Sequence, residues 1–147
     1  MAGEFLGTYE NSISNQRVNI PSAYKKEFSA AAKQSVVVTL GPSSSLVIYP
    51  YDKWKELIDR LKDGDRSEKM FRTQLIFWAD PKQKLEGPGR IRISKRLMEY
   101  ANIDKQVVLS GGNGFFYLWS PDNYKKYETK LRKLRDENMD EMFETLL

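Results

Sequence analysis

The sequence contains neither cysteine nor histidine among its 147 residues. Without cysteine there is no disulfide framework and no thiolate ligand for a metal ion. Without histidine the commonest general base and the commonest metal ligand are both missing, so catalysis would have to rest on carboxylates or lysines. These two absences argue against an enzyme and predict a protein that has neither a metal ion nor another cofactor.

Long apolar runs are missing as well. No stretch approaches the roughly 18 residues that a membrane span needs, and the first residues, MAGEFLGTYENS, have neither the basic start nor the apolar core of a signal peptide. The sequence therefore predicts a cytoplasmic protein without membrane contact. The 24 lysines and arginines exceed the 20 acidic residues, which gives a net charge of +4. This excess suits a polyanionic partner but does not require one.

The same pattern of residues occurs twice in the chain. Residues 17–28, RVNIPSAYKKEF, align with residues 90–101, RIRISKRLMEYA. In each copy, arginine, an apolar residue, a polar residue and isoleucine lead into a run with helical spacing. Residues 36–54 and 106–124 match in the same way further along. Because the period is far too long for a solenoid repeat, each copy is expected to be a complete supersecondary unit.

Each copy is expected to contain a strand, a strand leading into a helix, and a hairpin followed by a second helix. Apolar runs at 36–40 and 46–49 flank the turn GPSSS, and apolar runs at 107–109 and 115–119 flank SGGNG. Both connections are typical of β-hairpins.

Helices are expected outside the hairpins. Ser120 and Pro121 are typical of a helix start. Apolar residues from Met70 to Trp78, after the polar break KDGDRSE, predict a helix that packs between the two copies. The C-terminal segment is basic over residues 125–135 and acidic over residues 136–147, with several apolar residues at its end. Such a tail is expected to fold back or to meet a neighbouring chain.

Three groups that could carry chemistry have simpler interpretations. GGNG, residues 111–114, lacks the lysine and the serine or threonine of a phosphate-binding loop, and a strand follows where a helix would be needed. A hairpin turn is therefore favoured. The tryptophans lie in apolar patterns and are expected in the core: Trp54, Trp78 and Trp119. The clustered acids predict a solvated surface: Asp136, Glu137, Asp140 and Glu141.

The arginines at the start of each copy are better candidates for a binding site. Neighbouring side chains of a strand point to opposite faces. If the isoleucines of the second copy are buried, Arg90 and Arg92 share the open face, and by the same logic Arg17 of the first copy faces outward. Arginines on one surface can make bidentate contacts with guanine edges or clamp phosphates. Ordinary surface charge is the alternative explanation.

The duplicated pattern of turn, arginine, apolar residue, any residue, apolar residue and helix resembles the SpoVT-AbrB type of swapped-hairpin DNA-binding domain. The tandem arrangement of FLGTYENS, LVIYPYDKW and FYLWSPDNY around the copies is similar to the MraZ family over residues 5–127. This resemblance implies an α+β fold. Two tandem AbrB-like swapped-hairpin repeats would form one pseudo-two-fold, β-barrel-like core with flanking helices. The expected divisions are repeat 1 at 5–54, a helical connection at 55–80, repeat 2 at 81–124 and a C-terminal helix and tail at 125–147.

The resemblance also implies a function. It predicts a sequence-specific transcriptional regulator, expected to be a repressor, of the bacterial division and cell-wall gene cluster, which is nucleoid-associated and is not an enzyme. Its partners would be double-stranded DNA and further copies of itself in a ring-shaped homo-oligomer, with no small-molecule substrate. The residues expected to bind DNA are Arg17, Arg90, Arg92, Gln16 and Gly89. Possible phosphate contacts near the helix starts are Lys25, Lys26, Lys95 and Arg96.

The two turns depart from the family pattern of aspartate, two variable residues, glycine and arginine. In repeat 2 only the acid differs, with Glu86 in place of aspartate. Repeat 1 is one residue short, and SNQR has neither the acid nor the glycine, whose position is taken by Gln16. Ser94 also replaces the proline that repeat 1 keeps as Pro21. These departures leave a second interpretation open, a protein-interaction module of antitoxin-like type that keeps the scaffold but has a different partner.

Overall fold

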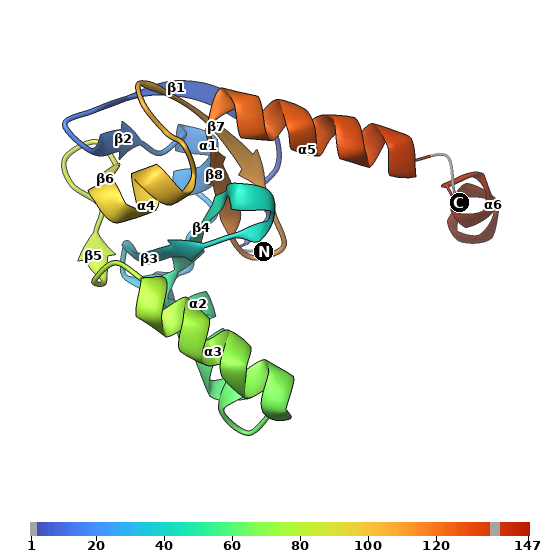
Figure 1. Ribbon diagram of the computed structural model, residues 1–147, viewed down its shortest axis with the longest axis horizontal. Helices are drawn as coiled ribbons and strands as arrows, with labels where there is room; N and C mark the ends of the chain where they lie inside the picture. Colours follow the sequence, from blue (N-terminus) through green and yellow to red (C-terminus); the bar gives the residue numbers. More distant parts are fainter. Residues whose placement is uncertain (1–2, 136–138) are drawn as a thin grey trace.

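The computed structural model describes residues 3–135 and 139–147, in which eight antiparallel strands form one sheet with helices around it (Figure 1). Asp136 and Glu137 of the acidic tail lie outside the described residues. The strands are β1 (Thr8–Ser14), β2 (Arg17–Asn19), β3 (Ser35–Leu40), β4 (Leu46–Pro50), β5 (Gln83–Lys84), β6 (Arg90–Arg92), β7 (Gln106–Gly111) and β8 (Phe116–Trp119). The helices are α1 (Ser22–Lys25), α2 (Tyr51–Lys62), α3 (Arg66–Trp78), α4 (Lys95–Tyr100), α5 (Pro121–Leu134) and α6 (Met139–Leu146), with 3-10 turns η1 (Ala30–Ala32) and η2 (Pro42–Ser44).

The two repeats exchange their first strands. The order in the sheet is β5-β3-β4-β8-β7-β1-β2-β6, so that β1 of the first repeat pairs with β7 of the second, and β5 of the second pairs with β3 of the first. A bridge between Glu86 and Arg90 brings the two ends of this order together. The sheet therefore closes almost completely into a barrel, and neither repeat has a complete sheet without the other.

The strand register shows the pseudo-two-fold relation. At the centre of the β4–β8 ladder Val47 faces Tyr117, and at the centre of the β2–β6 ladder Val18 faces Ile91. In each ladder, the pair before the centre maps onto the pair after it when the two sequence copies are aligned. Arg17 opposite Arg92, for example, corresponds to Arg90 opposite Asn19. The predicted α+β fold, with two tandem repeats around one barrel-like core, is thereby confirmed.

The barrel interior is filled by alternate strand residues, as the period-two pattern predicts. The outward neighbours Val37 and Val47 are also buried, because helices cover that part of the sheet from outside (Figure 1). Both predicted hairpins are present, β3–β4 and β7–β8. The largest fully buried side chains are Trp119, Tyr24, Phe5, Phe116, Leu46, Ile48, Leu75, Ile91, Ile93, Leu97, Leu109 and Leu118.

The predicted helix between the repeats is α3, but only its C-terminal end packs there. Leu75 is 2% exposed, whereas Met70 and Phe71 are 58% and 51% exposed. The reason is that α3 lies against α2 and projects with it away from the barrel (Figure 1), so its apolar face extends beyond the sheet that it was expected to cover. Its last residue, Trp78, reaches α4 of the second repeat through a ring contact with Tyr100.

The second flanking helix, α5, begins where the sequence predicts. The Ser120 side chain accepts a hydrogen bond from the backbone N–H of Asn123, and Pro121 occupies the first helical position. Trp119 is fully buried and stacks on Tyr127 of this helix, while Trp54 and Trp78 are only partly buried. α6 lies beyond the far end of α5 (Figure 1). No helix of residues 3–135 and 139–147 is long and apolar enough to cross a membrane.

Candidate nucleic-acid interface

The candidate interface is the two-stranded ribbon of β2 and β6. The register places Arg17 opposite Arg92 and Asn19 opposite Arg90, with Val18 and Ile91 between these pairs. The two central apolar residues are 1% and 0% exposed, so they face the core and the four polar side chains face outward. One short ribbon therefore presents three arginines and one asparagine on a single surface.

In repeat 1 a two-residue turn joins β1 to β2, the first strand of the ribbon. Asn15 and Gln16 both have positive φ angles, 51° and 63°, as the twist of a tight β-hairpin requires. Gln16 occupies the left-handed region without being glycine, and its side-chain amide donates to the carbonyl of Ile93 at 2.9 Å. Since the backbone N–H of Ile93 donates to the Gln16 carbonyl at 2.8 Å, the turn is fixed to the second repeat. This anchor compensates for the missing glycine.

In repeat 2 the turn has three residues, which confirms that repeat 1 is one residue shorter. The backbone N–H groups of Gly89 and Arg90 both donate to the Glu86 carbonyl. Gly89 has a φ of 117°, and a Cβ atom there would lie 2.4 Å from the Cδ atom of Lys25. The Lys25 ammonium donates to the carbonyl of Pro88. Glycine is needed because this position combines an unusual backbone angle with a close side-chain contact.

Polar side chains brace both edges of the ribbon. Gln83 of β5 donates to the Arg92 carbonyl and accepts from the Arg92 N–H, both at 2.8 Å. On the other side, Asn11 of β1 donates to the Asn19 carbonyl at 2.8 Å. These side chains bind the ribbon backbone at two further places, while the outward side chains of the ribbon are left to meet a ligand.

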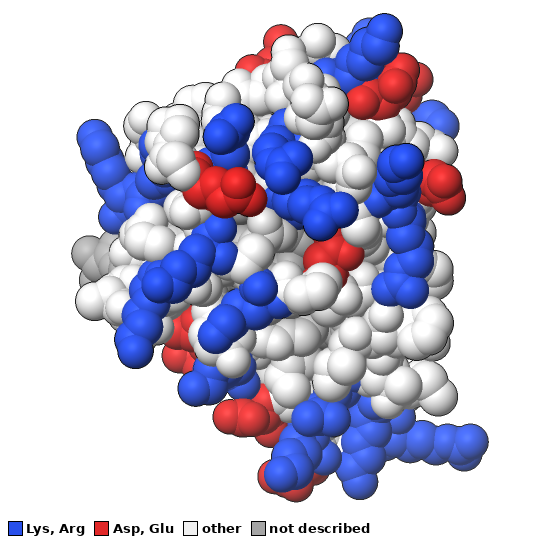
Figure 2. All heavy atoms as spheres, turned by 90° about the vertical axis from the view of Figure 1, so that its left-hand side faces the viewer, with Lys and Arg blue, Asp and Glu red and all other residues white. Residues whose placement is uncertain are grey.

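The ribbon arginines are only weakly neutralised. Arg17 donates to the Asn15 carbonyl at 3.1 Å and lies 3.9 Å from a carboxylate oxygen of Glu86, a largely exposed pair that contributes little. Arg90 and Arg92 are exposed and form no salt bridge within the part of the chain that the structure describes. Figure 2 shows lysine and arginine side chains spread over this side of the molecule, with fewer acidic ones between them. The surface can therefore attract a polyanion.

The four lysines and arginines expected near the helix starts do not form one group. Lys25 is turned onto the glycine turn of repeat 2, as described above, and Lys26 beside it is exposed. Lys95 is also exposed, at the start of α4. Arg96 points to α3, where it donates to the Phe77 carbonyl at 2.7 Å, and its guanidinium carbon lies 4.6 Å from the centre of a Trp78 ring. Arg96 therefore fastens α3 to the second repeat.

Sequence reasoning placed Asn19 on the outward face without naming it as a candidate, and it missed a group of lysines beside the ribbon. Asn19 shares the outward face with the arginines, which the alternation of β2 already indicates. Lys82 and Lys84 are far from Lys33 in the sequence, and the exchanged strand β5 brings them beside it.

The tyrosines whose pKa values are displaced lie away from the ribbon. Burial raises the pKa of Tyr49 to about 12, with a smaller contribution from Tyr117. Burial likewise raises the pKa of Tyr117 and of Tyr24. Among the described residues no cluster of acids is placed to hold a metal ion.

The family model described as "MraZ protein, putative antitoxin-like" matches residues 5–77 and again residues 76–146. The chain belongs to the MraZ family. A protein from Alkaliphilus metalliredigens is 29% identical over 144 residues, which cover 95% of this chain and 97% of the relative. One from Nitrosomonas eutropha is 34% identical over 114 residues, covering 76% and 77%, and one from Clostridium tetani is 30% identical over 126 residues, covering 84% and 86%. Each is named "Transcriptional regulator MraZ".

The two MraZ matches meet at the end of α3. The first includes the short turn with Asn15 and Gln16, and the second includes the three-residue turn before Arg90. Both versions of the turn are therefore compatible with the MraZ pattern in this chain.

Proposed function

We propose that this protein is a sequence-specific DNA-binding transcriptional regulator that contacts duplex DNA through the β2–β6 ribbon. The observation that supports this most strongly is the pairing of Arg17 with Arg92 and of Asn19 with Arg90 on one outward surface. The major groove of B-form DNA admits a two-stranded ribbon. The names of the relatives agree with this role, which requires no enzymatic activity and no cofactor.

In this proposal the arginines read bases and the surrounding groups position the ribbon. Arg17 and Arg90 can each make bidentate contacts with a guanine edge, while Arg92 contacts a base or a phosphate. The anchored turns at Gln16 and Gly89 fix where the two strands begin. Lys26 and Lys95 are available for phosphate contacts. In contrast, Lys25 and Arg96 act mainly through their contacts within the protein.

The proposal extends to assembly and to the regulated genes. Each misread base costs only about 1–3 kcal/mol, so one small ribbon has limited discrimination, and several copies on spaced sites would gain by avidity. Exposed apolar side chains on α3 and α6 supply surface for a homo-oligomer. We therefore propose a ring that represses the division and cell-wall gene cluster in the cytoplasm, associated with the nucleoid. The division into repeats at 5–54 and 81–124, the connection at 55–80 and the tail at 125–147 belongs to the same proposal.

The test is the binding of the purified protein to duplexes selected from a random pool, measured over a series of salt concentrations. The parent protein is expected to bind with an affinity that falls steeply as salt rises. Arg90→Ala should weaken binding by about 1–3 kcal/mol and change the free energy of unfolding by no more than about 0.5 kcal/mol. Arg60→Ala, an exposed arginine on α2, is the matched control and should leave binding unchanged.

A second function is favoured by the description of the family as putative antitoxin-like and by the exposed apolar surface of α3. In that case the scaffold would bind a partner protein. Tight binding of the selected duplex by Arg90→Ala would favour this interaction module over the regulator. The same conclusion would follow if the parent protein bound no DNA but bound a partner protein with an affinity that does not depend on salt.

A further inference from the structure

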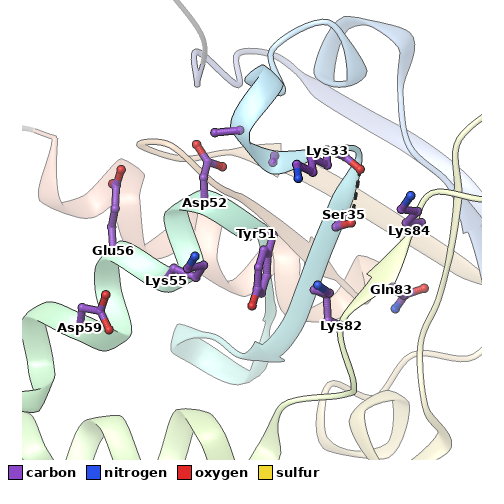
Figure 3. A pocket seen from close by; sticks show the side chains of 12 residues that line it. Lys33, Ser35, Tyr51, Asp52, Lys55, Glu56, Asp59, Lys82, Gln83 and Lys84 are labelled. Atoms are coloured by element: carbon purple, nitrogen blue, oxygen red, sulfur yellow. Dashed lines mark hydrogen bonds between the residues drawn. The ribbon is translucent and has the colours of Figure 1, made fainter.

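A groove of about 590 Å³ lies beside the ribbon, between β5, the end of η1 and the first turns of α2 (Figure 3). Lys33, Lys82 and Lys84 line its wall on the side of β5. All three are exposed, and none takes part in a salt bridge among the residues that the structure describes. The Lys82 ammonium lies 4.3 Å from the centre of the Tyr51 ring, which holds it at the groove without neutralising it.

The opposite wall of the groove is acidic on balance, because it carries three carboxylates beside Lys55. Asp52, Glu56 and Asp59 come from α2 and lie across the groove from the lysines (Figure 3). Asp52 accepts a hydrogen bond from the Ser29 hydroxyl at 2.7 Å, and Glu56 lies 3.6 Å from Lys53. An anion that enters this groove is therefore attracted to the β5 wall and repelled from the α2 wall.

The basic wall is continuous with the ribbon. A second hollow of about 300 Å³ has Lys82, Gln83 and Arg92 in its lining, together with Asp80, Pro81, Glu86 and Ser94. Gln83 makes two hydrogen bonds to the backbone of Arg92 and lies in the chain between Lys82 and Lys84. The lysines are thus fixed relative to the arginine that faces the proposed DNA, and they continue the positive surface away from the ribbon on one side.

The pseudo-two-fold relation shows that the other side of the ribbon is different. Gln83 of β5 donates to the Arg92 carbonyl and Asn11 of β1 donates to the carbonyl of Asn19, the counterpart of Arg92, so Gln83 and Asn11 are equivalent. Lys84 therefore corresponds to Ser12, and two residues earlier Lys82 corresponds to Glu10.

The third lysine also has an opposite counterpart. Lys33 lies two residues before the start of β3, and Asp104 lies two residues before the start of β7. The reading surface is nearly symmetric, but at these equivalent positions one flank carries three lysines and the other carries Glu10, Ser12 and Asp104.

We propose that Lys33, Lys82 and Lys84 bind the phosphate backbone of duplex DNA on one side of the ribbon, so that each protomer binds the duplex in a single orientation. This inference rests on the proposed function. The ribbon alone distinguishes poorly between two orientations related by its pseudo-two-fold axis, because Arg17 and Arg90 are equivalent and only Asn19 differs from its counterpart Arg92. The three lysines gain phosphate contacts in only one of them, because in the other orientation Glu10, Ser12 and Asp104 take their places.

The first measurement is the salt dependence of binding to a duplex selected from a random pool. The double variant Lys82→Gln/Lys84→Gln should lower the slope of log K against log salt by about 2, because each phosphate contact contributes about 0.9. The matched control is Lys130→Gln/Lys133→Gln, which removes two exposed lysines from the second half of α5 and should leave the slope unchanged. Equal slopes for the parent and the Lys82/Lys84 variant would overturn the proposal.

The second measurement is orientation. Because the chain has no cysteine, Ala31→Cys at the groove gives a single attachment point for an iron chelate that cuts nearby DNA. Cuts are expected on one side of the selected sequence only. Adding Glu10→Lys and Ser12→Lys should make the flanks alike and produce cuts on both sides. Equal cutting on both sides by the protein without these two changes would overturn the proposal.

These results separate the two proposals. If the parent protein binds no duplex from the pool, the proposed function and the single orientation both fail. If the parent binds and Arg90→Ala weakens binding, but the lysine variant keeps its slope and cuts fall on both sides, only the orientation proposal fails.

Discussion

Arg17 lies directly opposite Arg92 across the β2–β6 ladder, and both side chains face away from the core. Like charges that face each other across an antiparallel pair destabilise it. The Glu86 carboxylate, 3.9 Å from Arg17, offsets this only in part because the pair is exposed. A polyanion placed over the ribbon would relieve the repulsion, so the arrangement favours the bound state over the free protein.

We expect Arg92→Asn to stabilise the free protein. The substitution repeats the pairing that already exists between Asn19 and Arg90. Stability should increase by about 0.2–1 kcal/mol at low salt, and the gain should shrink at high salt as screening weakens the repulsion. Urea denaturation at two salt concentrations measures both effects, and DNA affinity should fall in the same variant. An unchanged stability at low salt would show that the two guanidinium groups do not repel each other appreciably.

Ile93→Ala should separate the core from the reading surface. Ile93 is completely buried, so the truncation should cost roughly 2–5 kcal/mol of unfolding free energy. Ile93→Val is the matched control and should cost about 0.5–1.5 kcal/mol. Chemical denaturation of both variants, beside Arg90→Ala, tests the assignment. If Ile93→Ala lowers the unfolding free energy by much less than this range, the barrel must repack to fill the cavity that the smaller side chain leaves.

The duplicated pattern and the alternation of residues in β2 and β6 were sufficient to predict the repeats and the outward arginines. The alternation of side chains along a strand is a local property, so it does not depend on which strand the segment pairs with. For this reason Arg90 and Arg92 could be assigned to one face before their partner strand was known. The helix start at Ser120 and Pro121 was predictable on the same local grounds.

The exchange of strands was implied only by the family resemblance, because no local pattern states that β1 pairs with β7 or β5 with β3. The lysine flank depends on that exchange and was missed. Arg96 was given a possible phosphate contact because it lies near a helix start, whereas its orientation depends on Phe77 and Trp78 from a distant helix. The projection of α3 likewise depends on how it packs with α2, not on its own apolar face.

Arg96→Gln is expected to loosen α3 without weakening DNA binding. The guanidinium donates to the Phe77 carbonyl and lies over the Trp78 ring, contacts of about 0.5–1 kcal/mol at an exposed site. Amide hydrogen exchange should become faster in the last turns of α3, while the salt dependence of DNA binding stays that of the parent. A salt slope lowered by about 1 would instead assign Arg96 to a phosphate.

Tyr49 should make the fold sensitive to alkali. Burial raises its pKa from the ordinary value of 10.0 to about 12, so the folded state favours the neutral phenol. The stability that this supplies is complete below about pH 10 and is lost as the pH rises through about 12. Tyr49→Phe cannot ionise and should retain about 2–3 kcal/mol more stability than the parent near pH 12. Urea denaturation of both proteins at neutral and alkaline pH measures the difference. A parallel decline of the two proteins would contradict it.

The last prediction concerns self-association through α6. The exposed apolar residues of this helix are Met139, Met142, Phe143 and Leu146, between 41% and 70% exposed. Patches of this kind on a small chain mark interaction surfaces, so we expect a homo-oligomer at micromolar concentration. Met142→Gln/Phe143→Gln removes apolar area, and glutamine is itself a good helix former, so the helix should be retained. The double variant should shift the molar mass measured by light scattering toward that of the monomer. Glu141→Gln on the same helix is the control and should not. If the parent protein is itself monomeric with and without DNA, association through this surface is wrong, and the proposed ring fails with it.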